Sequence, residues 1–388
     1  MPLPSRSDCC GCSACQVACP KQAISMTPDA EGFLQPAIDP ARCIHCGTCE
    51  SACPVLAPRR RQPDAAYLAA RAMSEPVRRG SSSGGVFPLL ARAMLLSGGV
   101  VYGARQEFPS GQVRHVRVDR EDRLPRLWGS KYLQSRMDEA LPMLARDVDE
   151  GRKALFSGTP CQVAALFSFL GRRPDDLVAA EVICHGVPSH ELFLDYRNDV
   201  IPPGKRDGVS GFLFRDKRVG WAKSGTCWQF RDGAPDLQAS SDLFLRAFSL
   251  DLVSRPSCHR CRFRDGASGS DLTLGDFWEG EVFHPDWDDE TGISAVVVRS
   301  PRGKALLDAA SSLGLDVRPS RRKDILAANS ALVRDFPPNR ARALFFRLRK
   351  HMRFSRAVRL ALGIDGFLSL PRHLRPSALR ERWKRLLA

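Results

Sequence analysis

The sequence has no signal peptide, no membrane-spanning segment and neither of the two common nucleotide-binding motifs. Residues 1–8 have neither the charged nor the apolar region of a signal peptide, and no run of about 18 apolar residues could span a bilayer. No GxGxxG follows an expected strand and no GxxxxGK[ST] occurs, so neither a dinucleotide fingerprint nor a P-loop is available. We therefore expect a soluble, cytoplasmic protein with another kind of site.

A nucleic-acid-binding signature is also missing, although the net charge of +15 at first suggests one. Residues 321–388 hold 18 Lys and Arg against 4 Asp and Glu, which leaves a net charge of only +1 for residues 1–320. Only the tail is basic, and no helix-turn-helix or zinc finger accompanies it. We expect no nucleic acid among the partners.

Cysteine, in contrast, is abundant, and most of it falls into two matched runs. Each run reads CxxCxxCxxxCP, and the second repeats the first at a constant offset of 34 residues. The spacing is that of a bacterial two-cluster ferredoxin, in which the first three thiolates of a run hold one [4Fe-4S] cluster and the fourth crosses to the other. The first set is therefore Cys9, Cys12, Cys15 and Cys53, and the second set is Cys43, Cys46, Cys49 and Cys19. A zinc ribbon is the alternative, but it leaves the third and fourth cysteines of each run unexplained.

The length of 388 residues suits two domains, or one large domain with an appendage. We expect a two-cluster ferredoxin-like module over residues 1–58, a larger domain over 64–330 and a basic helical tail over 331–388. In the larger domain, strands alternate with helices, which predicts a mixed α/β fold. The strands are expected at 65–71, 99–104, 112–118, 153–157, 177–183, 271–278, 292–300 and 315–318. The main helices are expected at 86–96 and 137–149, in the segment that follows Cys161 and ends at Leu170, and after Pro301.

A glycine- and serine-rich loop at residues 80–85 precedes the first of these helices. Such a loop leaves backbone N–H groups free at a helix N-terminus, which favours an anion such as a flavin or nucleotide phosphate. The alternative is an ordinary turn with Ser83 as the helix N-cap.

Six of the fourteen cysteines lie outside the two runs. Cys161 and Cys184 each follow the end of an expected strand, so they can face one site at the carboxyl edge of a sheet. With the CxxC pair of Cys258 and Cys261 they would make a further Cys₄ site. Alternatively, single cysteines are small buried hydrophobes and the CxxC is a zinc half-site. The two without a partner by spacing are Cys10 and Cys227.

Several separate segments carry a family pattern. They are residues 83–87 (SGGVF), 129–132 (GSKY) with Ser135, 156–162 (FSGTPCQ), 184–189 (CHGVPS), the Cys258 and Cys261 pair, and 275–278 (GDFW). Together with the cysteine runs, they resemble the beta subunits of coenzyme F420 hydrogenases and dehydrogenases, in the bacterial form that carries an N-terminal dicluster ferredoxin module. The resemblance covers roughly residues 5–330.

This resemblance implies a bound FAD with a third [4Fe-4S] cluster beside it. Its ligands would be a third set of cysteines, Cys161, Cys184, Cys258 and Cys261. The resemblance places FAD over Ser83, Gly84 and Gly85, with Gly129, Ser130, Lys131 and the turn of Ser157, Gly158 and Thr159 approaching it. Backbone donors and Lys131 would offset the phosphate charge or polarise the ring.

The activity that follows from the resemblance is that of an iron-sulfur flavoprotein oxidoreductase. It would pass electrons between a ferredoxin-type donor or another subunit, the clusters, FAD and a small organic acceptor, deazaflavin-like or otherwise unsaturated, in a setting such as polysaccharide assembly. His185 and Asp276 lie in motif turns and are candidates for the proton donor. Alternatively, His185 orients a cluster loop and Asp276 caps a turn. The rival functions are a non-catalytic electron-transfer subunit and a redox-sensing regulator.

The basic tail contains an imperfect amphipathic helix at residues 342–362. A basic amphipathic helix can lie on an anionic membrane surface, which would place the protein at the inner membrane face, or it can dock a partner. The alternative is a solvated helix packed on its own domain. The sequence leaves the oligomeric state open.

Overall fold

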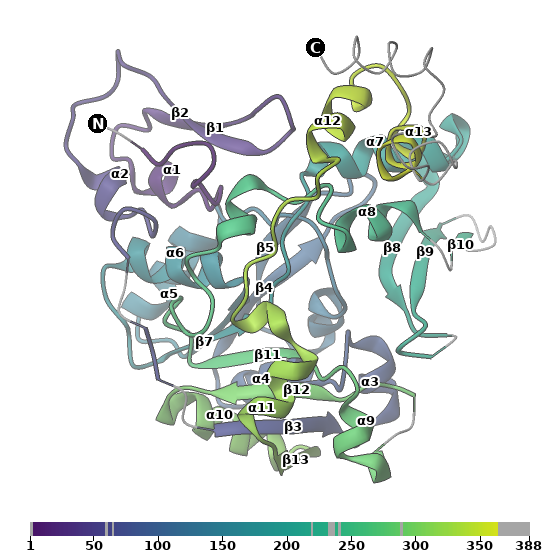
Figure 1. Ribbon diagram of the computed structural model, residues 1–388. Coiled ribbons are helices and arrows are strands. Elements are labelled where there is room, and N and C mark those ends of the chain that lie inside the picture. The colour runs from purple at the N-terminus through teal and green to yellow at the C-terminus, as the bar shows by residue number, and fades with distance from the viewer. Residues whose placement is uncertain are drawn as a thin grey trace.

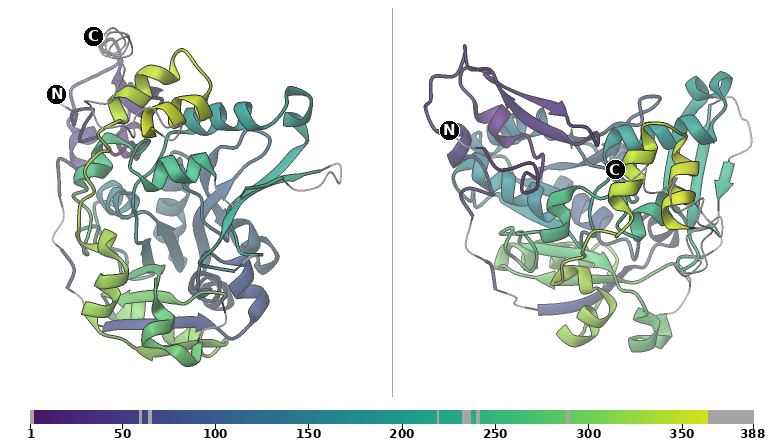
Figure 2. Two further views of the ribbon diagram at one scale, coloured as in Figure 1. Left: turned by 45° about the vertical axis from the view of Figure 1, so that its right-hand side comes forward. Right: turned by 45° about the horizontal axis from the view of Figure 1, so that its top comes forward.

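The computed structural model describes residues 3–58, 61–63, 66–218, 220–231, 237–239, 242–287 and 290–363. A large mixed sheet forms one half of the molecule. The N-terminal module and a helical lobe that includes the C-terminal helices lie next to each other on the other half (Figures 1 and 2). The expected mixed α/β architecture, with a ferredoxin-like module before it and helices after it, is confirmed.

The central sheet has eight strands, and its middle is parallel. In spatial order the strands are β13 (Leu315–Pro319), β3 (Ala66–Ala72), β12 (Ser294–Val298), β11 (Leu272–Asp276), β7 (Leu177–Val182), β6 (Ala154–Gly158), β4 (Val100–Gln106) and β5 (Val113–Val118). Strands β11, β7, β6 and β4 run parallel, whereas the outer strands join antiparallel. Because parallel strands end at the same edge, the loops after β6, β7 and β11 are brought together.

Both faces of this sheet are covered, as its parallel middle requires. Alternate residues point to opposite faces, so Leu155 and Val178 join one core while Phe156 and Ala179 join another. The first core is closed by α4 (Val86–Leu96) and α10 (Pro301–Ser311), and the second by α5 (Ala140–Asp149) and α6 (Pro160–Leu170). The strands and helices expected for this layer are confirmed, with small shifts at their ends.

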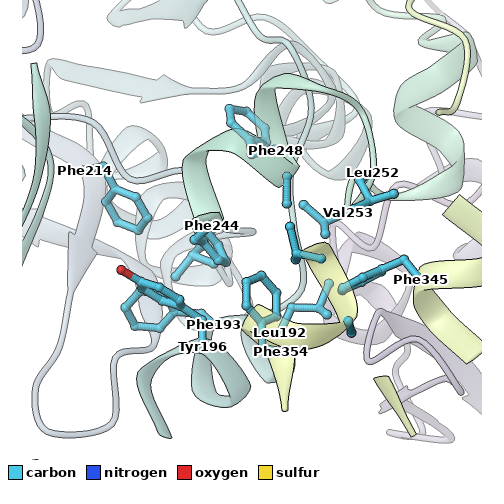
Figure 3. Close-up of a cluster of buried hydrophobic side chains, with 14 of the residues drawn as sticks. Leu192, Phe193, Tyr196, Phe214, Phe244, Phe248, Leu252, Val253, Phe345 and Phe354 are labelled. Carbon is cyan, nitrogen blue, oxygen red and sulfur yellow. The ribbon is translucent and has the colours of Figure 1, made fainter. Parts of the chain in front are cut away.

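A second lobe is built around aromatic side chains. It combines the antiparallel strands β8 (Val209–Asp216), β9 (Gly225–Phe230) and β10 (Leu237–Ala239) with α7 (His190–Val200) and α8 (Leu243–Ser249). Phe193, Tyr196, Phe244, Phe345 and Phe354 pack in its core (Figure 3). The strands and helices of this lobe were not predicted from the sequence. Register irregularities at two places in the β8–β9 pairing interrupt the alternation by which a strand is recognised.

The N-terminal module consists of a hairpin and two short helices. The elements are α1 (Ala14–Ala18), β1 (Ile24–Pro28), β2 (Leu34–Ile38) and α2 (Thr48–Ser51). Ala14 is fully buried in the core closed by α5 and α6, so the module packs against the larger domain. The remaining helices are α3 (Glu75–Gly80), α9 (Gly280–Phe283) and α11 (Arg322–Ala328), with short 3₁₀ helices at Glu121–Leu127, Pro203–Gly208, Pro256–Arg260, Pro285–Trp287 and Ser330–Leu332.

The tail forms two helices instead of the single helix expected at 342–362. They are α12 (Arg342–Arg349) and α13 (Phe354–Leu362), and their apolar sides are buried in the aromatic core. The arginines pair with carboxylates of the protein itself: Arg342 with Glu31, and Arg349 with Glu191 and Asp195. The apolar faces that a membrane contact through these helices would use are covered, so the structure agrees with the alternative of helices packed on their own domain. The rest of the tail, residues 364–388, lies outside the described residues.

Among the described residues, no helix is both long enough and apolar enough to cross a bilayer. The expected boundaries at 58, 64 and 330 stay predictions.

Candidate cofactor cavity and cysteine sites

A cavity of about 730 Å³ opens at the carboxyl edge of the parallel strands. The turn after β6, the loop after β7 and the end of β11 all line it, through residues that include Ser157, Cys184 and Asp276. The candidate residues that line it are Ser83, Gly85, Gly129, Ser130, Lys131, Ser157, Gly158, Thr159, Cys184, His185 and Asp276. Segments separated by about 190 residues of sequence thus meet at one place. Whether these side chains bind a cofactor stays a prediction.

Gly84 is the exception, because it is absent from the cavity wall and packs instead on the sheet. A Cβ atom there would lie 2.5 Å from the Ala70 carbonyl oxygen and 2.8 Å from the Ser294 backbone nitrogen. The Gly84 N–H donates to Ser294 Oγ at 2.9 Å, and the Ser83 hydroxyl donates to the Ile293 carbonyl at 2.6 Å. The glycine is thus needed for close approach of the loop to β3 and β12.

The helix that follows this loop has its N-terminus at the cavity. Gly85, with a φ of 85°, is the N-cap of α4, and no side chain caps the helix, so Ser83 as the cap is wrong. Val86 and Phe87, the first residues of α4, line the cavity. The first turn of a helix carries unpaired N–H groups, so this end of the cavity favours an anionic group.

The segment of residues 129–131 lines the cavity beside the glycine- and serine-rich loop. Gly129 has a φ of 76° and open space where a Cβ would lie, and the Ser130 hydroxyl donates to Ser82 Oγ at 2.8 Å. The Lys131 ammonium donates to the carbonyls of Leu127 and Trp128 at 2.8 and 2.6 Å. Burial lowers the pKa of Lys131 to about 7, so the amine changes charge near neutrality.

His115 supports this wall and escaped sequence analysis. Its Nε2 is 2.9 Å from the Ser157 carbonyl and its Nδ1 is 2.8 Å from Ser135 Oγ. Because a carbonyl can only accept, Nε2 carries the proton and Nδ1 accepts from the serine hydroxyl. Burial lowers the pKa of His115 to about 4, so the ring stays neutral and fixes the turn after β6. The sequence offers one signal for His115: in the alternation of β5 it falls on the same face as Val113, which is buried.

The two proton-donor candidates have different surroundings. His185 Nε2 lies 3.1 Å from Asp251 Oδ1, and the ring packs on Phe248 and Phe336. Asp276 instead accepts from Arg215 Nη1 at 2.6 Å. Asp276 is thus paired with a cation, whereas His185 lies beside a carboxylate, and the role of either as the proton donor stays a prediction.

Arg215 was also missed, and it completes an aromatic end of the cavity. Its guanidinium lies 4.9 Å from the ring centre of Trp278, which stacks on Trp221 at 4.6 Å. Trp278 lines the cavity and remains 39% exposed, whereas Trp221 behind it is buried. The exposed ring offers a surface on which a planar molecule can stack.

The structure brings the third set of cysteines together. Burial, followed by the neighbouring thiols, raises the pKa of Cys258 to about 12 and that of Cys261 to about 11, and the pKa of Cys184 also rises. Cys161 lies in the first turn of α6, where Thr159 and Gln162 form a capping box, and its Sγ is 3.2 Å from Thr159 Oγ1. Buried thiolates at such a site need a metal to supply positive charge, which fits a cluster.

In the N-terminal module, Cys19 lies with the second run, and Cys9, Cys15 and Cys53 lie near one another. Cys19 lines one small hollow with the three thiols of the second run, Cys43, Cys46 and Cys49. In the first set, burial and then the nearby Cys9 and Cys53 thiols raise the pKa of Cys15 to about 12. Their role as ligands stays a prediction.

No group of His, Cys, Asp and Glu side chains among the described residues is arranged around a single metal ion. In a [4Fe-4S] cube each cysteine binds a different iron, so the four sulfurs stay farther apart than they do around one ion.

Two family models match the chain. The model of the C terminus of the coenzyme F420 hydrogenase/dehydrogenase beta subunit matches residues 151–319, and a 4Fe-4S dicluster domain matches residues 8–57. Among solved structures, the chain is similar to one in the xenon-derivatised F420-reducing [NiFe] hydrogenase complex from Methanosarcina barkeri. The identity is 14% over 70% of this chain and 91% of that chain, with a TM-score of 0.47. No curated protein matches the chain. The two models include all twelve cysteines of the three sets, whereas residues 83–135 lie outside them.

Replacing Gly84 by alanine should destabilise the protein, because the new methyl group meets backbone atoms of two strands. We expect the free energy of unfolding, measured with denaturant, to fall by about 1–3 kcal/mol. The control is Gly103→Ala on β4, whose Cβ would meet side chains and no backbone: Leu127 at 3.2 Å and Phe87 at 3.5 Å. Equal losses in both variants would contradict the assignment of Gly84 to sheet packing.

Proposed function

Because residues 151–319 belong to the coenzyme F420 hydrogenase/dehydrogenase beta subunit family and residues 8–57 to the 4Fe-4S dicluster domains, we propose an iron-sulfur flavoprotein oxidoreductase. It would pass electrons between a redox partner, its [4Fe-4S] clusters, FAD and a small organic acceptor. The observation that carries the proposal is that Cys184, of the third set, lines the same cavity as the serine, glycine and lysine residues assigned to FAD. A cluster and a flavin would therefore be neighbours.

The cavity suits a flavin nucleotide in size and in chemistry. Its volume of about 730 Å³ lies within the range of cofactor pockets, roughly 300–1,000 Å³. The N-terminus of α4 and the Ser82 hydroxyl provide donors for phosphate and ring oxygens, and Lys131 supplies positive charge at the cavity. FAD, when bound, supplies the ability to exchange electrons singly with clusters and in pairs with an organic molecule.

The protein's own residues would manage the acceptor and its proton. Trp278 offers a planar acceptor a stacking surface, and Arg215 with Asp276 keeps that end of the cavity polar. His185 is our candidate proton donor, because it lines the cavity and its Nε2 lies 3.1 Å from Asp251 Oδ1. Asp276 would position Arg215 and act as a hydrogen-bond acceptor.

An electron-transfer subunit without its own substrate is the second candidate. It is favoured by the second set, where Cys46 and the neighbouring Ile44 are exposed, so a redox partner can approach that set directly. None of the fourteen cysteines forms a disulfide, so the twelve cysteines of the three sets are all available as cluster ligands.

The content of iron, acid-labile sulfide, zinc and flavin in protein purified without oxygen tests the proposal. We expect about twelve irons and one FAD per chain, corresponding to three clusters and a flavin. About eight irons without flavin would leave only the dicluster module and favour the second candidate. Zinc in place of iron would overturn both.

FAD affinity should depend on pH through Lys131. In the free protein the amine is charged below a pKa of about 7, and a bound anion favours the charged form and so raises that pKa. The contribution of Lys131 is thus present at low pH and lost as pH rises through the pKa of the complex. Fluorescence titration of flavin-depleted protein should show weaker FAD binding above neutrality. Lys131→Met should bind more weakly at low pH and lose this dependence, whereas exposed Lys153→Met should keep it; an unchanged slope in Lys131→Met would exclude the contact.

His185→Ala should separate flavin reduction from acceptor reduction. We expect the flavin to be reduced by dithionite as in the original protein, while reduction of an unsaturated acceptor falls by about 10²-fold or more. The assay is anaerobic turnover with a panel of acceptors that includes a deazaflavin. The control is His351→Ala, an exposed histidine outside the cavity. Unchanged turnover in His185→Ala would remove this residue as the donor.

A further inference from the structure

Cys10, which the spacing left without a partner, lies between two of the cysteine sets. Its side chain is only 8% exposed. Cys12 of the first set and Cys161 of the third set pack against the cluster that contains it, and the Cys10 thiol is within hydrogen-bonding reach of both. The other buried members of this cluster are Cys53, Val55, Ala164 and Phe263. Cys10 thus lies, with Cys53, in the buried cluster where the first and third sets meet.

The backbone around Cys10 is held firmly by the larger domain. Gln134 Nε2 donates to the carbonyls of Cys10 and Gly11 at 2.9 and 2.8 Å. Arg255 Nε donates to the Cys9 carbonyl at 2.7 Å. Gly11 has a φ of 64°, and a Cβ there would lie 2.5 Å from both Arg255 and Gln134 side-chain nitrogens. The contact between the sets is therefore built into the docking of the module.

The second set faces elsewhere. Its hollow is lined only by residues 19–49, all within the module. Cys46 is exposed, and Ile44 beside it is 56% exposed. Of the two N-terminal sets, the first is therefore the inner one and the second is the outer one.

We propose that Cys10 is a positioning residue that keeps the first set against the third set. The N-terminal module then exchanges electrons with the cavity through the first set, while the second set serves the redox partner. One electron leaves one set and enters the next, and no bond is made or broken. This inference rests on the proposed function, because it requires clusters at the first and third sets.

The experiment combines iron analysis with electron paramagnetic resonance of the reduced protein. If the original protein holds about twelve irons, its reduced clusters at the first and third sets should show magnetic interaction. Cys10→Leu adds bulk at the contact, so we expect unchanged iron content and loss of that interaction. Cys10→Ser keeps the size of the side chain and should retain it. Cys227→Ser, a buried cysteine outside all three sets, should behave as the original protein does.

Other outcomes distinguish a positioning role of Cys10 from a ligand role, and from failure of the proposed function. Loss of about four irons in Cys10→Ser would show that Cys10 is a ligand and would overturn the positioning role. Full interaction in an iron-replete Cys10→Leu protein would also overturn it. Should Cys10→Leu fail to hold iron, Cys10→Ala, which removes the thiol without adding bulk, must weaken the interaction. About eight irons in the original protein would contradict the proposed function itself.

Discussion

The fully buried guanidinium of Arg255 connects the N-terminal module to everything that surrounds the cavity. It donates to the carbonyls of Cys9 and Leu34 in the module and to Gln134 Oε1 in the larger domain. A buried cation is tolerated only when its donors are satisfied, and here the acceptors are neutral oxygens. Its charge therefore remains available to the nearby thiols. It opposes the rise in pKa that the Cys10 thiol and burial cause at Cys161, and that burial causes at Cys258. The same side chain thus fixes the module and favours anionic sulfur beside it.

The parallel middle of the sheet explains why the third set borders the cavity, which Cys184 lines. Cys161 and Cys184 follow adjacent strands whose carboxyl ends share an edge, and Asp276 ends the next strand. Once the chain forms this sheet, loops far apart in sequence have no other place to meet. The module then docks on α6, the helix that carries Cys161 in its first turn, which brings Cys10 to it.

The tail helices α12 and α13 complete the core of the aromatic lobe. Phe345 and Phe354 enter the core around Phe193, and Phe346 packs near Phe33 of the N-terminal hairpin at 6.4 Å. Arg342 and Arg349 pair with Glu31, Glu191 and Asp195. Part of the positive charge in this part of the tail is therefore paired with carboxylates of the protein itself. These helices also contact the hairpin, through Phe346 and Phe33 and through Arg342 and Glu31. Charge composition alone suggests a surface for other molecules, because it does not show where the matching carboxylates lie.

The sequence by itself determined the two cluster motifs, the alternation of strands and helices, and the loops that would meet at a cavity. These are local properties: cysteine spacing sets which thiols can share a cluster, and periodicity sets which side of an element is buried. Only the tertiary structure decided the roles of Cys10, His115 and Arg215, whose partners are up to 151 positions away in the chain. It also assigned Gly84 to strand packing. A contact between distant segments leaves no spacing in the sequence, since it depends on how closely two folded backbones approach.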